Sequence, residues 1–147
     1  MPSDHALQLL QQIDAAYQRL HGRGIGADTY QGEPAERLRW LHERAPFALL
    51  AHDAGPDPRF IYVNAAARRA FGYSEEEFIG LPSRFSADAE AQADRDAILA
   101  SVRARGFAEG YAGTRIRKDG THFRIERGEL WQLDEPKGQA ALVWAAA

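Results

Sequence analysis

The sequence predicts an α+β domain in which antiparallel strands are combined with helices. Two short apolar runs, residues 46–51 and 60–63, flank the spacer Asp-Ala-Gly-Pro-Asp-Pro, and this pattern indicates a β-hairpin. Nearer the C-terminus, three segments have strand patterns separated by turn residues: 111–118, 121–133 and 139–145. Asp119-Gly120 suits a two-residue turn between the first two of them. We therefore expect a hairpin, then helices, then a three-stranded meander.

Residues 3–21 have the pattern of an amphipathic helix that Ser3 or Asp4 caps. Its apolar side chains recur at three- and four-residue steps: Leu7, Leu10, Ile13, Tyr17 and Leu20. This stripe either packs on the domain's own sheet or pairs with a second copy of the chain, and a homodimer through this helix is the partner we expect. Residues 1–32 would then form a helix with a glycine-rich connection, and residues 33–147 the main domain.

Short polar residues and glycines mark the ends of the other helices. Glu33-Pro34 begins a helix, because proline is tolerated in the first turn. Asn64 caps a helix over residues 65–71. A longer helix over residues 87–105 begins at Ser86 or Asp88 and ends at Gly106.

The long strand 121–133 contains a conflict between its apolar pattern and its charges. Its odd positions carry the apolar side chains that should face the core: Phe123, Ile125, Trp131 and Leu133. Arg127 and Glu129 are also odd. Either Gly128 marks a bulge that resets the register, or the two charges form an inward ion pair. We favour the bulge, because burying two charges is costly before they pair.

Composition disfavours several classes of function. The net charge of −3 is not typical of a nucleic-acid binder, which usually has a basic face. No apolar run approaches the roughly 20 residues of a membrane span, and the first residues lack the pattern of a secretory signal. We therefore expect a cytoplasmic protein with neither a nucleic-acid nor a membrane partner.

No catalytic or metal-binding constellation is visible in the sequence. There is no cysteine, which excludes disulfides, thiolate metal sites and a cysteine nucleophile. The five histidines form neither a helical pair nor a short ligand cluster, so we expect no metal site. Ser83 lacks the glycines that flank a hydrolase nucleophile. The sequence therefore predicts a protein that is not an enzyme.

Two stretches resemble PAS domains, a sensor fold. Residues 60–66 resemble the family's "YVN-A" strand-to-helix junction, and residues 71–80 resemble its "FGYS-EE-IG" segment. A closer resemblance is to the MEKHLA domain, a PAS-like group found in short bacterial proteins and at the C-terminus of plant homeodomain–zipper transcription factors. It spans roughly residues 38–145 and rests on these segments and residues: 45–52, 57–58, Tyr62, Asn64, 81–84, 105–107, 111–116, 123–126, Trp131, 138–141 and Trp144.

The resemblance implies a five-stranded antiparallel sheet with short helices over one face, preceded by the N-terminal helical extension. It also limits the cofactors. Photosensing relatives that bond a flavin or another chromophore need a cysteine, and haem-binding relatives use a histidine on the long helix before the third strand. The sequence has no cysteine and no histidine within residues 87–105. The cofactor, if there is one, stays unidentified.

A cavity between the sheet and the short helices is the remaining candidate for a ligand site, because such sites are mostly apolar with a few polar groups. The residues expected to line it are His52, Phe47, Tyr62, Phe71, Ser83, Phe85, Tyr111, Arg115, Phe123, Trp131 and Trp144. The alternative is that the aromatic side chains simply fill the core. His52 is a hydrogen-bonded structural residue, a polar group of the cavity or a base. Arg115 shares an exposed sheet face with Arg117 or contacts an anion.

We therefore expect a sensory or signalling module that binds a small molecule, a protein partner or both, without catalysis. One alternative is a ligand-free interaction or dimerisation module. The other is a small enzyme that uses His52.

Overall fold

The computed structural model describes residues 3–146, with the backbone alone at residues 89 and 90. Residues 1, 2 and 147, at the ends of the two predicted regions, lie outside this range. The elements in chain order are α1 (Asp4–His21), the 3₁₀ helix η1 (Pro34–Glu36), α2 (Arg37–Glu43), β1 (Ala48–Asp53), β2 (Phe60–Val63), α3 (Ala65–Phe71), α4 (Glu75–Phe78), the 3₁₀ helix η2 (Ser83–Ser86), α5 (Ala89–Arg105), β3 (Phe107–Ile116), β4 (His122–Asp134) and β5 (Lys137–Ala145).

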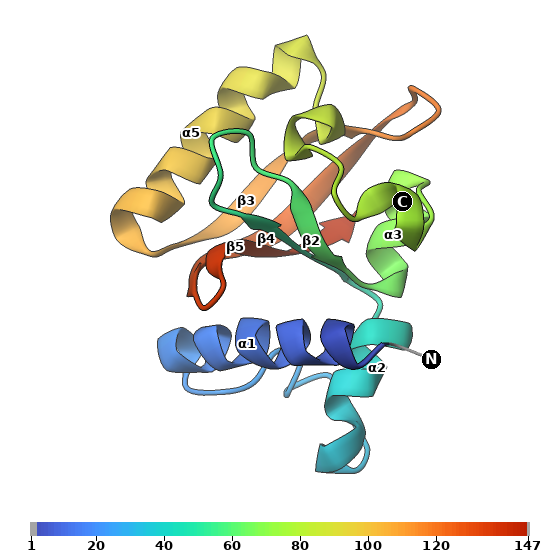
Figure 1. Cartoon of the computed structure of the whole chain (residues 1–147), viewed down its shortest axis with the longest axis vertical. Helices are drawn as coiled ribbons and strands as arrows, with labels where there is room; N and C mark the ends of the chain where they lie inside the picture. The colour runs from blue at the N-terminus through green and yellow to red at the C-terminus, as the bar shows by residue number, and fades with distance from the viewer. Residues whose placement is uncertain (1–2, 147) are drawn as a thin grey trace.

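One antiparallel sheet with the strand order β2-β1-β5-β4-β3 forms the middle layer, as the resemblance implied. Helices cover both of its faces (Figure 1). α1 and α2 lie on one side, which we call the α1 face, and α3 and α5 lie on the other, which we call the α5 face. Each face has its own apolar cluster, so the sheet is buried on both sides.

α1 packs along the sheet with most of the predicted apolar stripe, but Leu20, at the C-terminal end of the stripe, is 45% exposed. Ser3 caps it by accepting a hydrogen bond from an amide of the first turn. Leu10, Ile13 and Tyr17 are buried in the cluster of the α1 face, and the Trp131 indole N–H donates to the Ile13 carbonyl at 3.1 Å. The alternative in which the stripe covers the protein's own sheet is therefore confirmed. Among residues 3–146, no helix combines the length and the apolar character that a membrane crossing requires.

Asn64 joins the hairpin to the helices, as its position predicted. Its side-chain oxygen accepts from the amides of Ala67, at 3.0 Å, and Leu49, at 2.9 Å. Its side-chain nitrogen donates to the carbonyls of Leu41 and Phe47. The residue is fully buried, and these bonds satisfy both ends of its amide. The predicted helix cap is thus also a brace between α2, β1 and α3.

The predicted bulge in β4 is confirmed. The pairing between β4 and β5 shifts by one residue between Glu126 and Glu129. Arg127 has a φ of 52°, in the left-handed region that side-chain-bearing residues rarely adopt. Gly128 lies opposite Tyr111, where an added Cβ would come within 2.9 Å of the Tyr111 carbonyl oxygen. The glycine is therefore required by close approach of the two strands.

The bulge also reverses the faces, because one extra residue moves every later side chain to the other side of the sheet. Phe123 and Ile125, before the bulge, belong to the cluster of the α5 face. Trp131 and Leu133, after it, belong to the cluster of the α1 face. The expectation that these odd positions share one core is therefore wrong.

β3 is longer than predicted, and β5 also begins earlier, at Lys137 rather than at residue 139. Gly106 ends α5 with a left-handed φ of 88°, and Asp88 caps the start of that helix. β3 starts to pair with β4 directly after Gly106, since Phe107 lies opposite Trp131. β3 consequently begins four residues before the predicted start at Tyr111.

Candidate functional site

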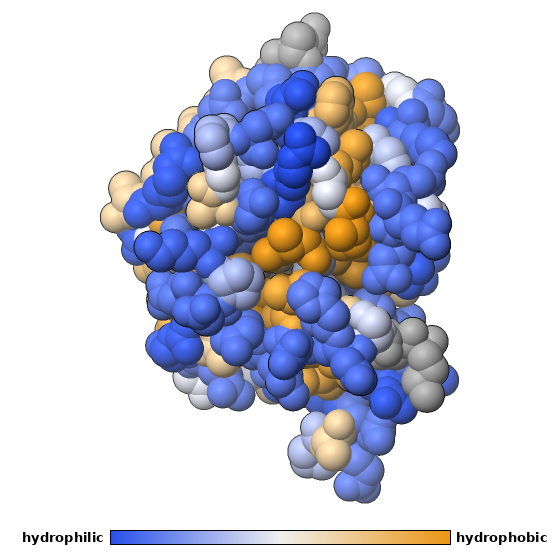
Figure 2. Space-filling view, viewed as in Figure 1, coloured by the Kyte–Doolittle hydropathy of each residue, from blue (hydrophilic) through white to orange (hydrophobic). Residues whose placement is uncertain are grey.

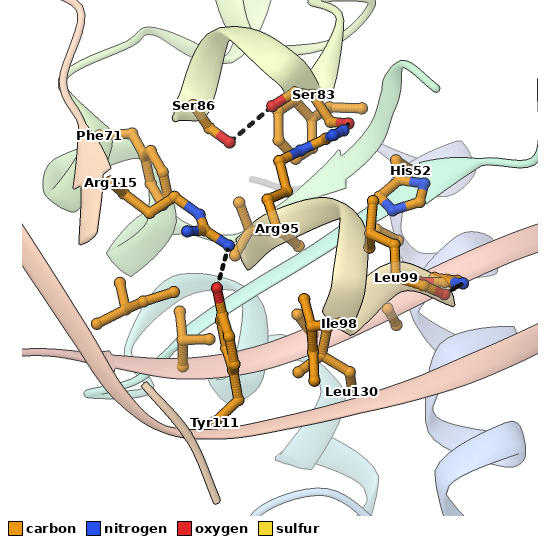
Figure 3. Close-up of a pocket in the computed structure, with 18 residues that line it drawn as sticks. His52, Phe71, Ser83, Ser86, Arg95, Ile98, Leu99, Tyr111, Arg115 and Leu130 are labelled. Carbon is orange, nitrogen blue, oxygen red and sulfur yellow. Dashed lines mark hydrogen bonds between the residues drawn. The ribbon is translucent and has the colours of Figure 1, made fainter. Parts of the chain in front are cut away.

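A cavity of about 70 Å³ lies on the α5 face, between the sheet and α5 (Figure 3). Its volume would hold on the order of five water molecules. Every strand of the sheet contributes to its lining, together with α3, η2 and α5. The lining residues are Leu50, Ala51, His52, Phe60, Phe71, Ser83, Ser86, Arg95, Ile98, Leu99, Tyr111, Arg115, Ile125, Leu130, Gln139, Ala140, Ala141 and Val143.

Arg115 brings a positive charge from β3 into this cavity. Its side chain is buried, with 8% exposed, because it shares the inward face of β3 with Tyr111. The guanidinium donates to the Tyr111 hydroxyl at 3.0 Å and to the Thr114 carbonyl at 2.9 Å. The Tyr111 hydroxyl in turn donates to Asp94 at 3.0 Å. Burial raises the pKa of Tyr111, although the Arg115 charge opposes this, so the phenol keeps its proton at neutral pH.

Arg95 brings a second positive charge from α5, and 7% of this residue is exposed. Its guanidinium donates to the buried Ser83 hydroxyl and to the Asp96 carboxylate, the latter at 3.0 Å. Burial lowers the pKa of Arg95, the Asp96 charge opposes that shift, and the like charge of Arg115 adds to it. Arginine nevertheless stays protonated in proteins, so this cavity has two buried cations on its walls.

His52 and Gln139 form the opposite, hydrogen-bond-accepting part of the lining. They lie directly across from each other on β1 and β5. His52 Nδ1 is 2.9 Å from the Asp53 carbonyl oxygen, which can only accept, so Nδ1 carries the proton and Nε2 is left as an acceptor. The Gln139 amide nitrogen donates to the Leu99 carbonyl at 3.1 Å. Neither His52 Nε2 nor Gln139 Oε1 has a hydrogen-bond partner among the described residues, although both atoms are buried.

Two further observations extend this accepting region. Burial lowers the pKa of His52, although its bond to the Asp53 carbonyl opposes this, so the ring is neutral near pH 7. Gln132 on β4 lies across from Gln139, and its Oε1 is a third buried acceptor with no partner in the described part of the chain. The three side chains follow one another across β1, β5 and β4.

The structure brings five of the predicted site residues together at the cavity: His52, Phe71, Ser83, Tyr111 and Arg115. Four others lie on the α1 face: Phe47, Tyr62, Trp131 and Trp144. Phe123 packs against Phe71, with ring centroids 5.0 Å apart, outside the lining. Phe85 is 47% exposed at the surface. The exposed sheet face expected for Arg115 is wrong, because its side chain points into the core.

Sequence reasoning missed Arg95 and Gln139. A signal for Arg95 exists, because it precedes Ile98 and Val102 at the three- and four-residue steps of one helix face. An arginine in the apolar stripe of a helix is a candidate for a buried charge. No comparable signal marks Gln139, whose position depends on the pairing of β5 with β1. Within residues 3–146, no group of three or more histidine, aspartate or glutamate side chains could hold a metal ion.

Solved structures with the same architecture are PAS and LOV domains. The PAS domain of a Colwellia psychrerythraea protein matches with a TM-score of 0.65 and 18% identity, over 76% of this chain and 95% of that one. The LOV domain of the Erythrobacter litoralis EL346 blue-light activated histidine kinase matches with a TM-score of 0.56 and 25% identity, over 71% and 99%. A Rhodobacter sphaeroides LOV protein matches with a TM-score of 0.62 and 19% identity, over 77% and 66%.

None of the curated proteins matches this sequence. The family model of the MEKHLA domain matches residues 7–146, which is nearly the whole chain and includes most of α1. With its PAS-like sheet and this match, the chain belongs to the MEKHLA domain family.

Proposed function

We propose that this chain is a sensory module that binds a small polar molecule in the cavity of the α5 face without changing it chemically. The observation that carries the proposal is the pair of buried acceptors, His52 Nε2 and Gln139 Oε1, that line the cavity without a partner. A buried polar atom without a hydrogen bond costs about 1–3 kcal/mol. A bound molecule that donates to either atom would recover the free energy lost at that atom, and both atoms line the cavity.

The polar contacts of the cavity support binding rather than catalysis. Ser83 is its most plausible nucleophile by residue type, and a serine nucleophile needs an adjacent base. The Ser83 hydroxyl instead accepts from the Arg95 guanidinium, which supplies a positive charge and no base. The Ser86 hydroxyl is engaged with the Ser83 carbonyl at 2.7 Å. These contacts position donors around a guest molecule.

Native mass spectrometry of freshly purified protein, combined with thermal shifts across a metabolite panel, tests the proposal. We expect a retained or stabilising small molecule, and we expect Ala141→Leu, which places extra side chain at the cavity, to abolish the shift. No retained molecule and no shift with any compound would contradict the sensor and favour the ligand-free module. Turnover of a panel compound that is lost in His52→Ala would favour the small enzyme.

A ligand-free interaction module is the second candidate, because apolar surface gathers in the middle of the molecule, over the region of β2 (Figure 2). β2 is an edge strand of the sheet, and a sheet edge can pair with another chain, although the backbone of Phe60 already bonds to Gly80 and Leu81. This surface differs from the one expected for a homodimer, because the apolar stripe of α1 is committed to the sheet. The homodimer and the cytoplasmic location stay predictions. Light scattering over a concentration series measures the mass, and a monomer throughout would contradict the dimer.

A further inference from the structure

We infer that the ligand of this cavity is a small hydroxycarboxylate of about two or three carbons, of the size of glycolate or lactate. The inference rests on the proposed function and names the chemical class of its ligand. Three observations carry it: two buried guanidinium groups, two buried acceptors without partners, and the volume between them.

The buried arginines call for an anion. Arg115 has no carboxylate within ion-pair distance among the described residues, and its guanidinium donates to a hydroxyl and a carbonyl. The carboxylate that Arg95 contacts belongs to Asp96, whose side chain is 68% exposed and so faces solvent. A charge buried without a close counter-ion is costly. Each guanidinium has five N–H donors and uses two of them in these contacts, so donors remain for a carboxylate.

The hydrogen-bond acceptors of the lining favour a ligand that also carries a hydrogen-bond donor. His52 Nε2 and Gln139 Oε1 would repel a second carboxylate, and each of them can accept the one hydrogen bond that a hydroxyl group donates. An ammonium group fits less well, because the buried guanidinium groups of Arg95 and Arg115 already line this cavity. A hydroxyl donates a hydrogen bond without adding positive charge to this already cationic site. A hydroxy acid is therefore favoured over an amino acid.

The positively charged groups and the hydrogen-bond-accepting groups lie at different places along the cavity. Figure 3 shows Arg115 beside Tyr111 at one side and His52 at the other, with Arg95 between them. Ile98 and Leu130 supply apolar wall between these polar groups. The volume of about 70 Å³ suits a guest of roughly five or six non-hydrogen atoms and excludes a nucleotide or a flavin. A short carbon chain with a carboxylate and a hydroxyl fits this volume, supplies an anion for the guanidinium groups and supplies a hydrogen-bond donor for one of the two acceptors.

Isothermal titration calorimetry on the full chain tests the inference with four probes that differ in one group each. L-lactate carries the carboxylate and the hydroxyl, propionate lacks the hydroxyl, lactamide lacks the charge, and alanine replaces the hydroxyl with an ammonium. We expect lactate or glycolate to bind, and each altered probe to bind at least about tenfold more weakly, as expected for the loss of one charge-assisted or buried hydrogen bond.

Three variants locate the site. Arg115→Gln is expected to weaken lactate binding by about tenfold or more, and Arg115→Lys, which keeps the charge and loses the fork, by less. Gln139→Leu should remove the preference for lactate over propionate while carboxylate binding persists. Arg117→Gln is the matched control, since Arg117 lies just beyond the end of β3 and donates to the Ala70 carbonyl outside the cavity. It should leave the affinity unchanged.

The outcomes separate this inference from the proposed function. If the metabolite panel yields a neutral or cationic ligand and no carboxylate binds, the inference is overturned and the sensor stands. If nothing binds, both fail. Lactate binding of unchanged affinity in folded Arg115→Gln would also overturn it, because the anion would then bind elsewhere.

Discussion

The two faces of one sheet differ in how closely their side chains pack and in whether their buried polar atoms have hydrogen-bond partners. On the α1 face, Trp131 is fully buried, its ring packs edge-on against Tyr17 at 4.9 Å, and its N–H has a partner. On the α5 face, one step along the same strand, Leu130 borders a cavity that also contains Arg95 and Arg115. Around Trp131 the first face is filled and the indole N–H is satisfied, while a pocket of about 290 Å³ that opens to solvent lies on this face beside Tyr17, Phe47 and Trp144. The second gives up packing and retains unsatisfied polar groups, which is the pattern of a functional site.

The largest expected effect comes from truncating adjacent residues of β4 that face opposite ways. Trp131→Ala should lower the free energy of unfolding by about 3–5 kcal/mol, because it opens a void in a filled cluster and frees the Ile13 carbonyl. Leu130→Ala should cost less, about 2 kcal/mol, because its site already adjoins empty space. Urea unfolding followed by fluorescence or circular dichroism measures both. Equal losses would contradict the difference between the faces.

Replacing one alanine on each face by leucine tests the same difference in packing, because it adds side-chain volume instead of removing it. Ala16 in α1 is 4% exposed and packs on the filled face, so Ala16→Leu should destabilise by about 1–3 kcal/mol. Ala141 lines the cavity, and Ala141→Leu should change stability by less than about 1 kcal/mol. Thermal and chemical unfolding of the two variants give the answer. A loss at Ala141 as large as that at Ala16 would mean that the α5 face is already full.

Local chemistry made much of the fold predictable. The cap at Asn64, the stop at Gly106 and the apolar stripe of α1 each depend on residues within a turn or two of sequence, and each is confirmed. The bulge was also predictable from the misplaced charges Arg127 and Glu129. The division of the chain at residue 32 stays a prediction.

The site was harder, because its parts are assembled by long-range pairing. Aromatic residues were expected to line one cavity, but the bulge sends Trp131 to the face opposite Phe123. Five of the predicted residues do meet at the cavity, yet its charge and its accepting atoms depend on Arg95 and Gln139. The positions of Arg95 and Gln139 depend on how α5 packs on the sheet and how β5 pairs with β1. Neither of these long-range contacts can be predicted from a local sequence pattern.

Removing an unsatisfied group should have the opposite sign from removing a packed one. Gln139→Leu is expected to raise the free energy of unfolding of the ligand-free protein by up to about 1 kcal/mol, because a buried acceptor without a partner is replaced by apolar surface. The lost bond to the Leu99 carbonyl limits the gain. Chemical unfolding without added ligand is the measurement, and a clear loss of stability would show that Gln139 is satisfied in solution.

The last expected effect is a pH dependence to which both faces contribute. Burial lowers the pKa of His52 at the cavity and of His42, whose ring shares a 2.8 Å hydrogen bond with Tyr62 of the α1 face. A histidine whose folded pKa lies below its unfolded value near 6.5 binds its proton more readily after unfolding. Stability is therefore full above pH 6.5 and falls as the pH drops below it, by at most about 1.4 kcal/mol per pH unit for each histidine.

Unfolding between pH 7.5 and 5.5 checks this with His52→Asn and His42→Asn. Each variant should flatten the pH dependence relative to the unmodified chain. Variant curves that run parallel to the original would show that neither histidine is held neutral by burial.

The most direct test of the central claim, that one face is filled and the other binds a ligand, is an NMR titration of the full chain with L-lactate. The Trp131 indole N–H reports on the α1 face, while the Gln139 side-chain amide and the Arg115 Nε–H report on the cavity. We predict that the Gln139 and Arg115 signals shift in a saturable way while the Trp131 signal stays in place. Unchanged cavity signals, or a shift of the Trp131 signal as large as theirs, would contradict the account.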